Sequence, residues 1–150
     1  MVFSLDAGRY ALPLHSVDRI VRAVQVTSLR QAPSVVLGAI CVAGQILPVF
    51  NLRQRFGLPE RDISPADQFL IARTRARRVV LAVDGVSGVF ELPAAAMTDA
   101  GNLAPGLVHI RGVIPLANDL VLIQDLEAFL SPVEAQALDA ELKQAAARGD

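Results

Sequence analysis

The sequence predicts a mainly β protein built from two similar small modules, with one long helix near the C-terminal end. Three observations support this prediction: an internal repeat, a series of short strand-like segments separated by turn residues, and a helix-start pattern at Ser131-Pro132-Val133-Glu134. Half of a 150-residue chain is too short to bury much apolar surface by itself. We therefore expect the two modules to share one core.

The repeat consists of two matches that keep the same order along the chain. With a shift of 69 residues, residues 11–20 align with residues 80–89. With a shift of 74, residues 38–52 align with residues 112–126, and a glycine begins both copies. Apolar strands can align by chance, but the shared order and the near-equal spacing favour two copies of one structural unit.

The strand-like segments are short, and turn residues separate them. Residues 2–5 and 10–14 flank a turn at Asp6-Ala7-Gly8-Arg9, and β-branched residues are frequent in residues 17–26. Strands at 39–42 and 46–50 would be joined by a turn in which Gly44 supplies a positive φ angle. Asn118 holds the equivalent place in the second copy. Further strands are expected at 69–72, 78–83 and 86–92, after a polar linker at 58–67.

Helices are expected at the end of each copy and at the end of the chain. Asn51 and Asp125 stand where a side chain can cap a short helix, at 52–56 and 126–130 respectively. Ser131 and Glu134 form a capping box with a proline at the first helical position, and this pattern begins a helix that runs to residue 148. Apolar residues of that helix recur at intervals of three and four, which predicts a face that packs on the strands: Ala135, Leu138, Leu142 and Ala145.

Composition excludes several classes of function. The chain is 53% hydrophobic with a mean hydropathy of +0.43, and its net charge is −1. Such a charge balance gives no general attraction to nucleic acid or to an anionic membrane. Cys41 is the single cysteine, which excludes an intramolecular disulfide and a cysteine-rich zinc site. The most apolar segment, residues 35–50, contains Gly and Pro and is shorter than a membrane-spanning helix, and no signal peptide is recognisable. We expect a cytoplasmic protein.

No catalytic or cofactor-binding pattern is present. His15 and His109 lack the spacing of metal ligands, and Gly85-Val86-Ser87-Gly88 lacks the spacing of a nucleophile elbow. Four arginines lie close together at residues 73, 75, 77 and 78, but without aromatic residues between them, so a solvated sheet edge is favoured over a nucleic-acid site. We expect no enzyme, no metal and no cofactor, and we expect exposed apolar patches that bind other proteins.

The sequence also resembles a known family. Residues 36–57 resemble the GVINLRGxIxPVIDLRxRFG signature of CheW-like domains, the coupling modules of bacterial chemosensory arrays. Residues 10–14, 83–86 and 123–126 are similar to other marks of the family. The resemblance implies two pseudo-symmetric five-stranded SH3-like β-barrels packed together. In this single domain, residues 1–150, the first barrel would span about 10–66. The second would span about 67–130 together with an N-terminal strand at 1–7, and a C-terminal helix would follow at 132–148.

The family also implies a function. CheW-like proteins are non-enzymatic adaptors that couple the cytoplasmic tip of a methyl-accepting chemoreceptor to the regulatory domain of a CheA-type histidine kinase. Carried over to this chain, a set of residues would line or support the partner-binding surfaces: Val17, Ile20, Gly38, Val86 and Val89. Ala43 stands where the family has a signature arginine that serves coupling, and Cys41 stands where it has asparagine.

Two alternatives follow from these departures and from the composition. A divergent CheW-like module could serve a non-chemotactic pathway, such as twitching motility, as an assembly spacer or a competitor. More remote alternatives are a barrel that binds a small molecule and an unrecognised hydrolase. A shallow apolar groove between the barrels would favour the adaptor, whereas an enclosed polar pocket would favour the small-molecule reading.

Overall fold

Short strands are the main regular elements of the computed structural model, which describes residues 1–91, 94–99, 110–116 and 119–147. One sheet contains β1 (Val2–Leu5), β2 (Gly8–Ala11), β8 (Gly85–Gly88), β9 (Thr98–Asp99), β10 (Ile110–Leu116) and β11 (Asp119–Gln124). The other contains β3 (Val17–Arg22), β4 (Val36–Val42), β5 (Gln45–Phe50), β6 (Gln68–Arg73) and β7 (Arg78–Val83). The helices are α1 (Leu52–Phe56) and α2 (Pro132–Ala147), with 3₁₀ turns η1 (Leu14–Ser16), η2 (Ala94–Ala96) and η4 (Leu126–Ala128).

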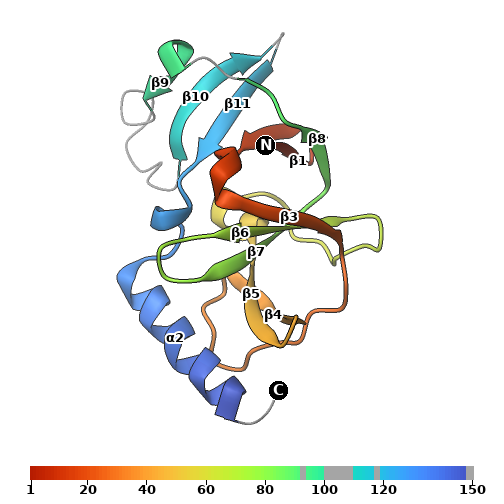
Figure 1. Ribbon diagram of the computed structural model, residues 1–150, viewed down its shortest axis with the longest axis vertical. Helices are drawn as coiled ribbons and strands as arrows, with labels where there is room; N and C mark the ends of the chain where they lie inside the picture. Colours follow the sequence, from red (N-terminus) through yellow and green to blue (C-terminus); the bar gives the residue numbers. More distant parts are fainter. Residues whose placement is uncertain (92–93, 100–109, 117–118, 148–150) are drawn as a thin grey trace.

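The two sheets lie one above the other along the long axis of the molecule (Figure 1). Their strand orders are β8-β1-β2-β11-β10-β9 and β3-β6-β7-β5-β4, and the sixth strand of the larger sheet is the two-residue β9. The prediction of a mainly β fold with two similar sheets and a C-terminal helix is confirmed. We call the region where the two sheets meet the seam.

Both shifts of the sequence repeat reappear in the strand pairing. In the five-stranded sheet Val49 of β5 pairs with Val80 of β7, in parallel. In the six-stranded sheet Ile123 of β11 pairs with Ala11 of β2, also in parallel. Val49 and Ile123 are related by the shift of 74, and Ala11 and Val80 by the shift of 69. The repeat therefore describes two copies of one structural unit.

Each copy is divided between the two sheets: its first hairpin lies in one sheet, and the strand after that hairpin, which we call the exchanged strand, lies in the other. The β1–β2 hairpin belongs to the six-stranded sheet, but the next strand, β3, pairs with β6 of the five-stranded sheet. Likewise β8 follows the β6–β7 hairpin and pairs with β1 of the six-stranded sheet. The exchanged pairs are equivalent: Val17 lies opposite Ala72, and Val86 lies opposite Phe3. Figure 1 shows β3 and β8 on either side of the seam.

This exchange divides the chain differently from the expected barrels at 10–66 and 67–130. Residues 68–83 belong to the five-stranded sheet, because β6 and β7 pair with β3 and β5. β2 stays with the N-terminal strand β1 in the six-stranded sheet, because it pairs with β11. Partners distant in sequence thus decide which sheet a strand joins.

The predicted turn and helix cap are confirmed in the first copy, and the predicted cap is absent from the second. Ala43 and Gly44 form the two-residue β4–β5 turn with φ angles of 49° and 81°. Asn51 caps α1, since its side-chain oxygen accepts the Gln54 amide N–H at 3.2 Å. The short helix expected at 126–130 is present as the 3₁₀ helix η4 at Leu126–Ala128, but the equivalent Asp125 makes no side-chain cap bond there, so the predicted cap is wrong. Asn118 lies outside the described residues.

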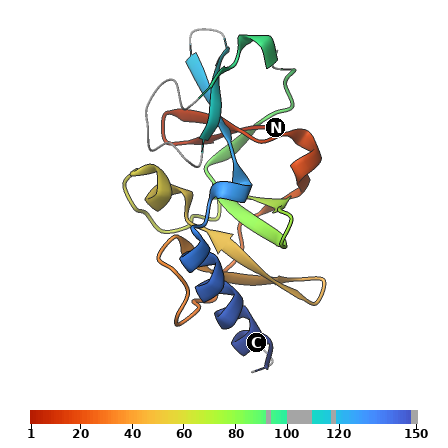
Figure 2. The same ribbon diagram turned by 90° about the vertical axis from the view of Figure 1, so that its left-hand side faces the viewer.

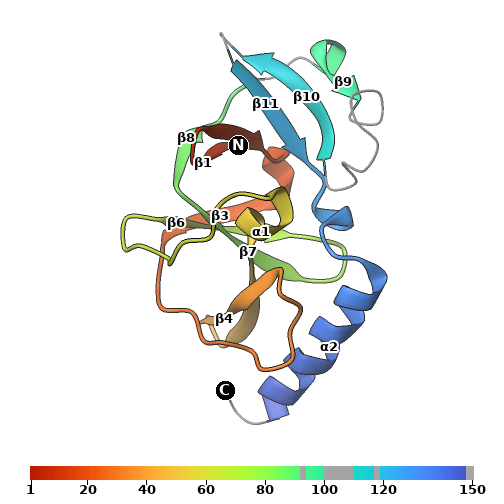
Figure 3. The same cartoon turned by 180° about the vertical axis from the view of Figure 1, so that it is seen from behind.

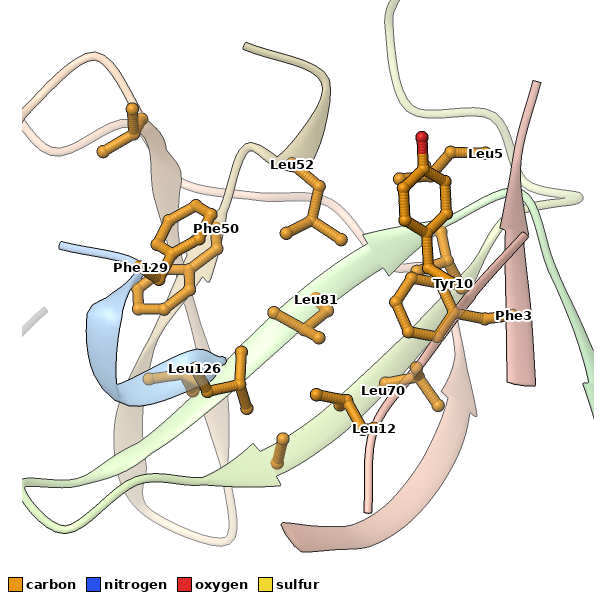
Figure 4. Close-up of a cluster of buried hydrophobic side chains, with 14 of the residues drawn as sticks. Phe3, Leu5, Tyr10, Leu12, Phe50, Leu52, Leu70, Leu81, Leu126 and Phe129 are labelled. Carbon is orange, nitrogen blue, oxygen red and sulfur yellow. The ribbon is translucent and has the colours of Figure 1, made fainter. Parts of the chain in front are cut away.

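One hydrophobic cluster crosses the seam, as Figure 4 shows. Phe3 and Tyr10 from the six-stranded sheet meet Leu70 and Leu81 from the five-stranded sheet in this cluster, and all four are buried. We call this cluster across the seam the central cluster. Two smaller clusters lie within the individual sheets. The central cluster confirms that the two modules share a core, which neither could supply alone.

Helix α2 packs beside the five-stranded sheet (Figure 2). Its capping box is present: the Glu134 amide N–H donates to the Ser131 hydroxyl at 3.1 Å, and the Ser131 amide N–H donates to the Glu134 carboxylate at 2.8 Å. Leu138 and Ala145 are buried on its inner face, and Leu142 packs against the central cluster. Just before the helix, the Phe129 ring stacks on Phe50 with 4.3 Å between centroids. The apolar face predicted from the helical spacing is the one that docks.

Candidate partner-binding surface and the seam

Four of the expected partner-binding residues form two equivalent pairs on the exchanged strands. Val17 and Ile20 lie on β3, while Val86 lies on β8 and Val89 directly follows it. The shift of 69 carries Val17 onto Val86 and Ile20 onto Val89. The structure therefore presents the same pair of side chains twice, once on each strand that crosses between the sheets.

Within each pair, one side chain faces inward and the other faces solvent. Val17 and Val86 are partly buried and pack against the central cluster. Ile20 and Val89 are 36% and 57% exposed. Another large apolar side chain is exposed two residues after each strand ends, Val24 at 53% and Phe90 at 42%. The inner members support the strands, and the outer members offer apolar surface to a partner.

Gly38 lies against the segment that follows β3, at Val26 and Thr27. It is buried in β4 at a register shift, and a Cβ atom at this position would lie 2.2 Å from the backbone oxygen of Thr27. Gly112 occupies the equivalent place in β10, where a Cβ would lie 2.8 Å from the backbone oxygen of Thr98. The absence of a side chain lets a neighbouring segment approach the bulged strand closely in both sheets. Gly38 therefore offers no side chain to a partner.

Ala43 lies away from the exchanged strands. It is exposed at the tip of the β4–β5 hairpin, and β4 and β3 stand at opposite ends of the five-stranded order. Cys41 is also exposed, two residues before it on β4. A methyl group at position 43 donates no hydrogen bond, whereas arginine carries a planar fork of donors. The hairpin tip consequently lacks the directional contacts that an arginine there would make.

An ion-pair network joins the sheets at the seam, where α1 lies (Figure 3). The Arg53 side chain of α1 is only 9% exposed. Its guanidinium contacts Asp6 at 2.9 Å and donates to both carboxylate oxygens of Asp84, at 2.8 and 3.0 Å. Asp6 belongs to the β1–β2 turn and Asp84 lies between β7 and β8. One arginine thus ties a turn of each sheet to the helix between them.

Arg61 of the linker extends this network. It donates to both oxygens of the Asp67 carboxylate, at 2.7 and 3.0 Å, and it also pairs with Asp84. Burial by itself would raise the pKa of Asp84, but the Asp6 amide N–H and the guanidinium groups of Arg53 and Arg61 hold that pKa below its usual value. The pKa of Asp67 is also lowered: burial opposes this shift, and the hydrogen bonds from Arg61 and Ser64 outweigh it. Both carboxylates are therefore held in the charged form.

The second arginine of the signature-like segment anchors the C-terminal helix. Arg55 donates to the Glu134 carboxylate at 2.6 Å, and its guanidinium lies 5.3 Å from the centre of the Phe129 ring. Burial would raise the pKa of Glu134, but the bonds from the Ser131 amide and from Arg55 lower it overall. Sequence reasoning missed the roles of Arg53 and Arg55. The signal available was their place in the signature-like segment, directly after the Asn51 cap.

The arginine cluster at the β6–β7 hairpin is partly paired. Arg73 and Arg78 both contact Asp18 of β3, and Arg77 contacts Asp139 of α2. The expectation that this cluster forms a sheet edge is wrong, because β6 and β7 are inner strands of the five-stranded sheet. These ion pairs connect the hairpin to strand β3 and to helix α2.

An open groove borders the exposed residue Val24. It has a volume of about 650 Å³ and lies between residues 23–26 and linker residues 60–65, with Leu37 and Ile63 in its lining. Among the described residues, no group of His, Cys, Asp and Glu side chains is arranged to hold a metal ion. No helix within the described ranges is long and apolar enough to cross a membrane.

Comparison with known proteins identifies the family of this chain. The model of the CheW-like domain family matches residues 1–134. The chain belongs to the CheW-like domain family. It is 24% identical to a probable chemotaxis protein CheW of Rhizobium etli, over 91% of this chain and 90% of that protein. It is 26% identical to the chemotaxis protein CheW of Klebsiella aerogenes, over 93% and 85%.

A solved structure shares the fold. The crystal structure of the scaffolding protein TtCheW from Thermoanaerobacter tengcongensis superimposes with a TM-score of 0.80 at 24% identity, over 89% of this chain and 92% of that one. The resemblance stated from the signature-like segment is therefore confirmed. The CheW-like family consists of non-enzymatic scaffold proteins of chemotaxis signalling.

Proposed function

We propose that this protein is a cytoplasmic adaptor that couples the tip of a chemoreceptor to the regulatory domain of a chemosensory histidine kinase. Membership of the CheW-like family, matched over residues 1–134, is the observation that carries the proposal. The curated relatives are named chemotaxis proteins, and the solved relative is named a scaffolding protein. An adaptor needs partner-binding surfaces rather than catalytic groups, and the exposed apolar residues of this chain supply such surfaces.

The exposed apolar residues on the exchanged strands suit a helical partner. Ile20 and Val89 stand at equivalent positions, each followed by a further exposed apolar side chain. An amphipathic helix binds by placing its apolar residues on such a surface. We assign this surface to the receptor tip and propose that the tip binds there as such a helix. The interior of the seam is filled by the central cluster, so that the contact is made at the surface.

The hairpin tip bears on how strongly the protein couples. Ala43 replaces the signature arginine, and it does so at an exposed turn where a longer side chain has room. We propose that contacts at this tip are weaker than in relatives that carry the arginine. This substitution also favours the second candidate function, a divergent module that occupies a place in an array as a spacer or competitor, including in a non-chemotactic pathway.

A binding titration tests the proposal. The full chain would be titrated with a receptor-tip fragment and, separately, with a kinase regulatory domain, and binding followed by calorimetry. We expect both to bind, and we expect Ile20→Asp and Val89→Asp to weaken receptor binding at least about tenfold, because a charge is then buried against an apolar helix. Val133→Asp is the matched control, since Val133 is 76% exposed at the start of α2.

The outcomes separate the candidates. Ala43→Arg should strengthen binding of at least one partner if the missing arginine limits coupling. If the chain binds the kinase domain but not the receptor fragment, and if Ala43→Arg changes neither result, the spacer is supported. No binding of either partner would refute the adaptor.

A further inference from the structure

A polar pocket lies at the seam, between the ends of strands from both sheets. Its volume is about 220 Å³. The β6–β7 hairpin of the five-stranded sheet contributes Arg73 and Arg75 to its lining, and strands β10 and β11 of the six-stranded sheet contribute Arg111 and Gln124. None of the expected partner-binding residues lines it.

The first observation concerns Gln124, the last residue of β11. Gln124 is only 2% exposed, and its side-chain amide nitrogen has no hydrogen-bond partner among the described residues. A buried N–H group without an acceptor is unfavourable, and such groups are rare in folded proteins. Because Gln124 lines the pocket, an acceptor atom bound there can satisfy this donor.

The second observation concerns the charges around the pocket. Arg73 is paired with Asp18, but Arg75 and Arg111 make no ion pair with any of the described residues. Two carboxylates also line the pocket, Asp125 and Glu127, and Glu127 accepts the backbone N–H of Arg75 at 3.0 Å. The lining therefore contains three arginines and two carboxylates, and the guanidinium donors of Arg75 and Arg111 remain available for a ligand.

We propose that this pocket binds a small oxyanion, a phosphate or carboxylate group of a molecule in solution. Guanidinium groups bind these oxyanions with two parallel hydrogen bonds, and the unpartnered Gln124 amide adds a further donor to the lining. The volume corresponds to about seven water molecules at ~30 Å³ each, which suits a small anion. The oxyanion would contact both sheets at once and so stabilise their arrangement. This site is separate from the adaptor surface, so either proposal can fail without the other.

Titration of the full chain with inorganic phosphate, and in parallel with malonate, tests this proposal. Ionic strength is held constant with chloride, and binding is followed by the side-chain amide signals of Gln124 in ¹⁵N–¹H spectra. We expect saturable shifts of these signals with a dissociation constant on the order of 1 mM, a value typical of weak specific binding. Arg111→Ala and Arg75→Ala should each weaken binding about tenfold or more, because each removes a charge-assisted contact.

Arg22→Ala is the matched control, since Arg22 is exposed at the end of β3 and does not line the pocket. Binding that is saturable in the control and weakened in the two pocket variants supports the site. The absence of saturable shifts with both anions, or an equal loss of binding in Arg22→Ala, would overturn it.

Discussion

Replacement of Arg53 by methionine tests how the two sheets are held together. Methionine keeps most of the apolar stem of the arginine and removes its guanidinium. The change breaks the contacts with Asp6 and Asp84 and the 3.1 Å bond to the Pro59 backbone oxygen. It also leaves Asp84, whose side chain is 25% exposed, with Arg61 as its remaining arginine partner.

The expected cost follows from this burial. Breaking a fully buried ion pair costs about 3–5 kcal/mol. Since the side chains of Asp84 and Asp6 are 25% and 41% exposed, solvent screens part of the charge that is left behind. We therefore expect a loss of about 2–3 kcal/mol in the free energy of unfolding, which lowers the melting temperature of a chain this size by roughly 4–12 °C.

Urea and thermal denaturation of four variants, including one double variant, measure this effect. Arg22→Met makes the same chemical change on an exposed arginine of β3, and we expect it to shift stability by no more than about 0.5 kcal/mol. A double-mutant cycle of Arg53→Met with Asp84→Asn should give a coupling energy of about 1–3 kcal/mol. Equal stabilities for Arg53→Met and Arg22→Met, or strictly additive effects in the cycle, would refute the assignment of Arg53 as a link between the sheets.

Three further predictions concern strain and charge. Gly38→Ala should lower the free energy of unfolding by about 3 kcal/mol or more, and Gly112→Ala should lower it less. The reason is that the added Cβ lies 2.2 Å from a backbone oxygen in the first case and 2.8 Å in the second. A urea titration in which Gly112→Ala is the more destabilising change would contradict this geometry. Ala43→Asn should raise stability by about 0.5–1 kcal/mol in the same assay, since asparagine tolerates the φ of 49° better than alanine. Because the folded-state pKa of Asp84 is lowered, the stability it contributes is present above its unfolded pKa of about 3.9 and is lost as pH falls through the folded value. The stability difference between the wild type and Asp84→Asn should thus be largest near neutral pH and shrink below about pH 4, and a pH-independent difference would exclude this linkage.

Local signals in the sequence were enough to predict the repeated unit. Gly38 and Gly112 mark the same bulge, and the two-residue turn at Ala43-Gly44 has the predicted positive φ at the glycine. These features depend on a few neighbouring residues, which is why pattern reasoning finds them. Asp125 shows the limit of this approach: its side chain is suited to capping, but the backbone after it forms a 3₁₀ turn.

The exchange of β3 and β8 could not be predicted from the sequence. Val17 pairs with Ala72, 55 residues away, and Val86 pairs with Phe3, 83 residues away. An apolar pattern indicates that a strand is buried, but it does not indicate which strand that strand pairs with. A division of the chain into consecutive barrels follows sequence order, and the long-range pairing overrides that order.

The family resemblance pointed to Val17, Ile20, Val86 and Val89, whose role in partner binding stays a prediction. The structure places them on, or directly after, two equivalent strands. The partners of Arg53 could not be predicted, because Asp6 and Asp84 lie 47 and 31 positions away and a charged residue in a sequence does not indicate its partner. The pocket at Gln124 was also missed, since its lining comes from both sheets.

The exchanged strands have a consequence for how the protein is made and how it moves. After 56 residues the ribosome has produced one whole copy of the unit, yet neither sheet is complete. The five-stranded sheet still lacks β6 and β7, and the six-stranded sheet still lacks β8 to β11. Stable structure must therefore wait for the second copy, and the protein should fold in a single cooperative step. In the finished molecule two chain crossings, at residues 12–16 and at Asp84, tie the sheets together, so that swinging one against the other would strain both at once. Two partners bound to opposite sheets would be held at a constant angle.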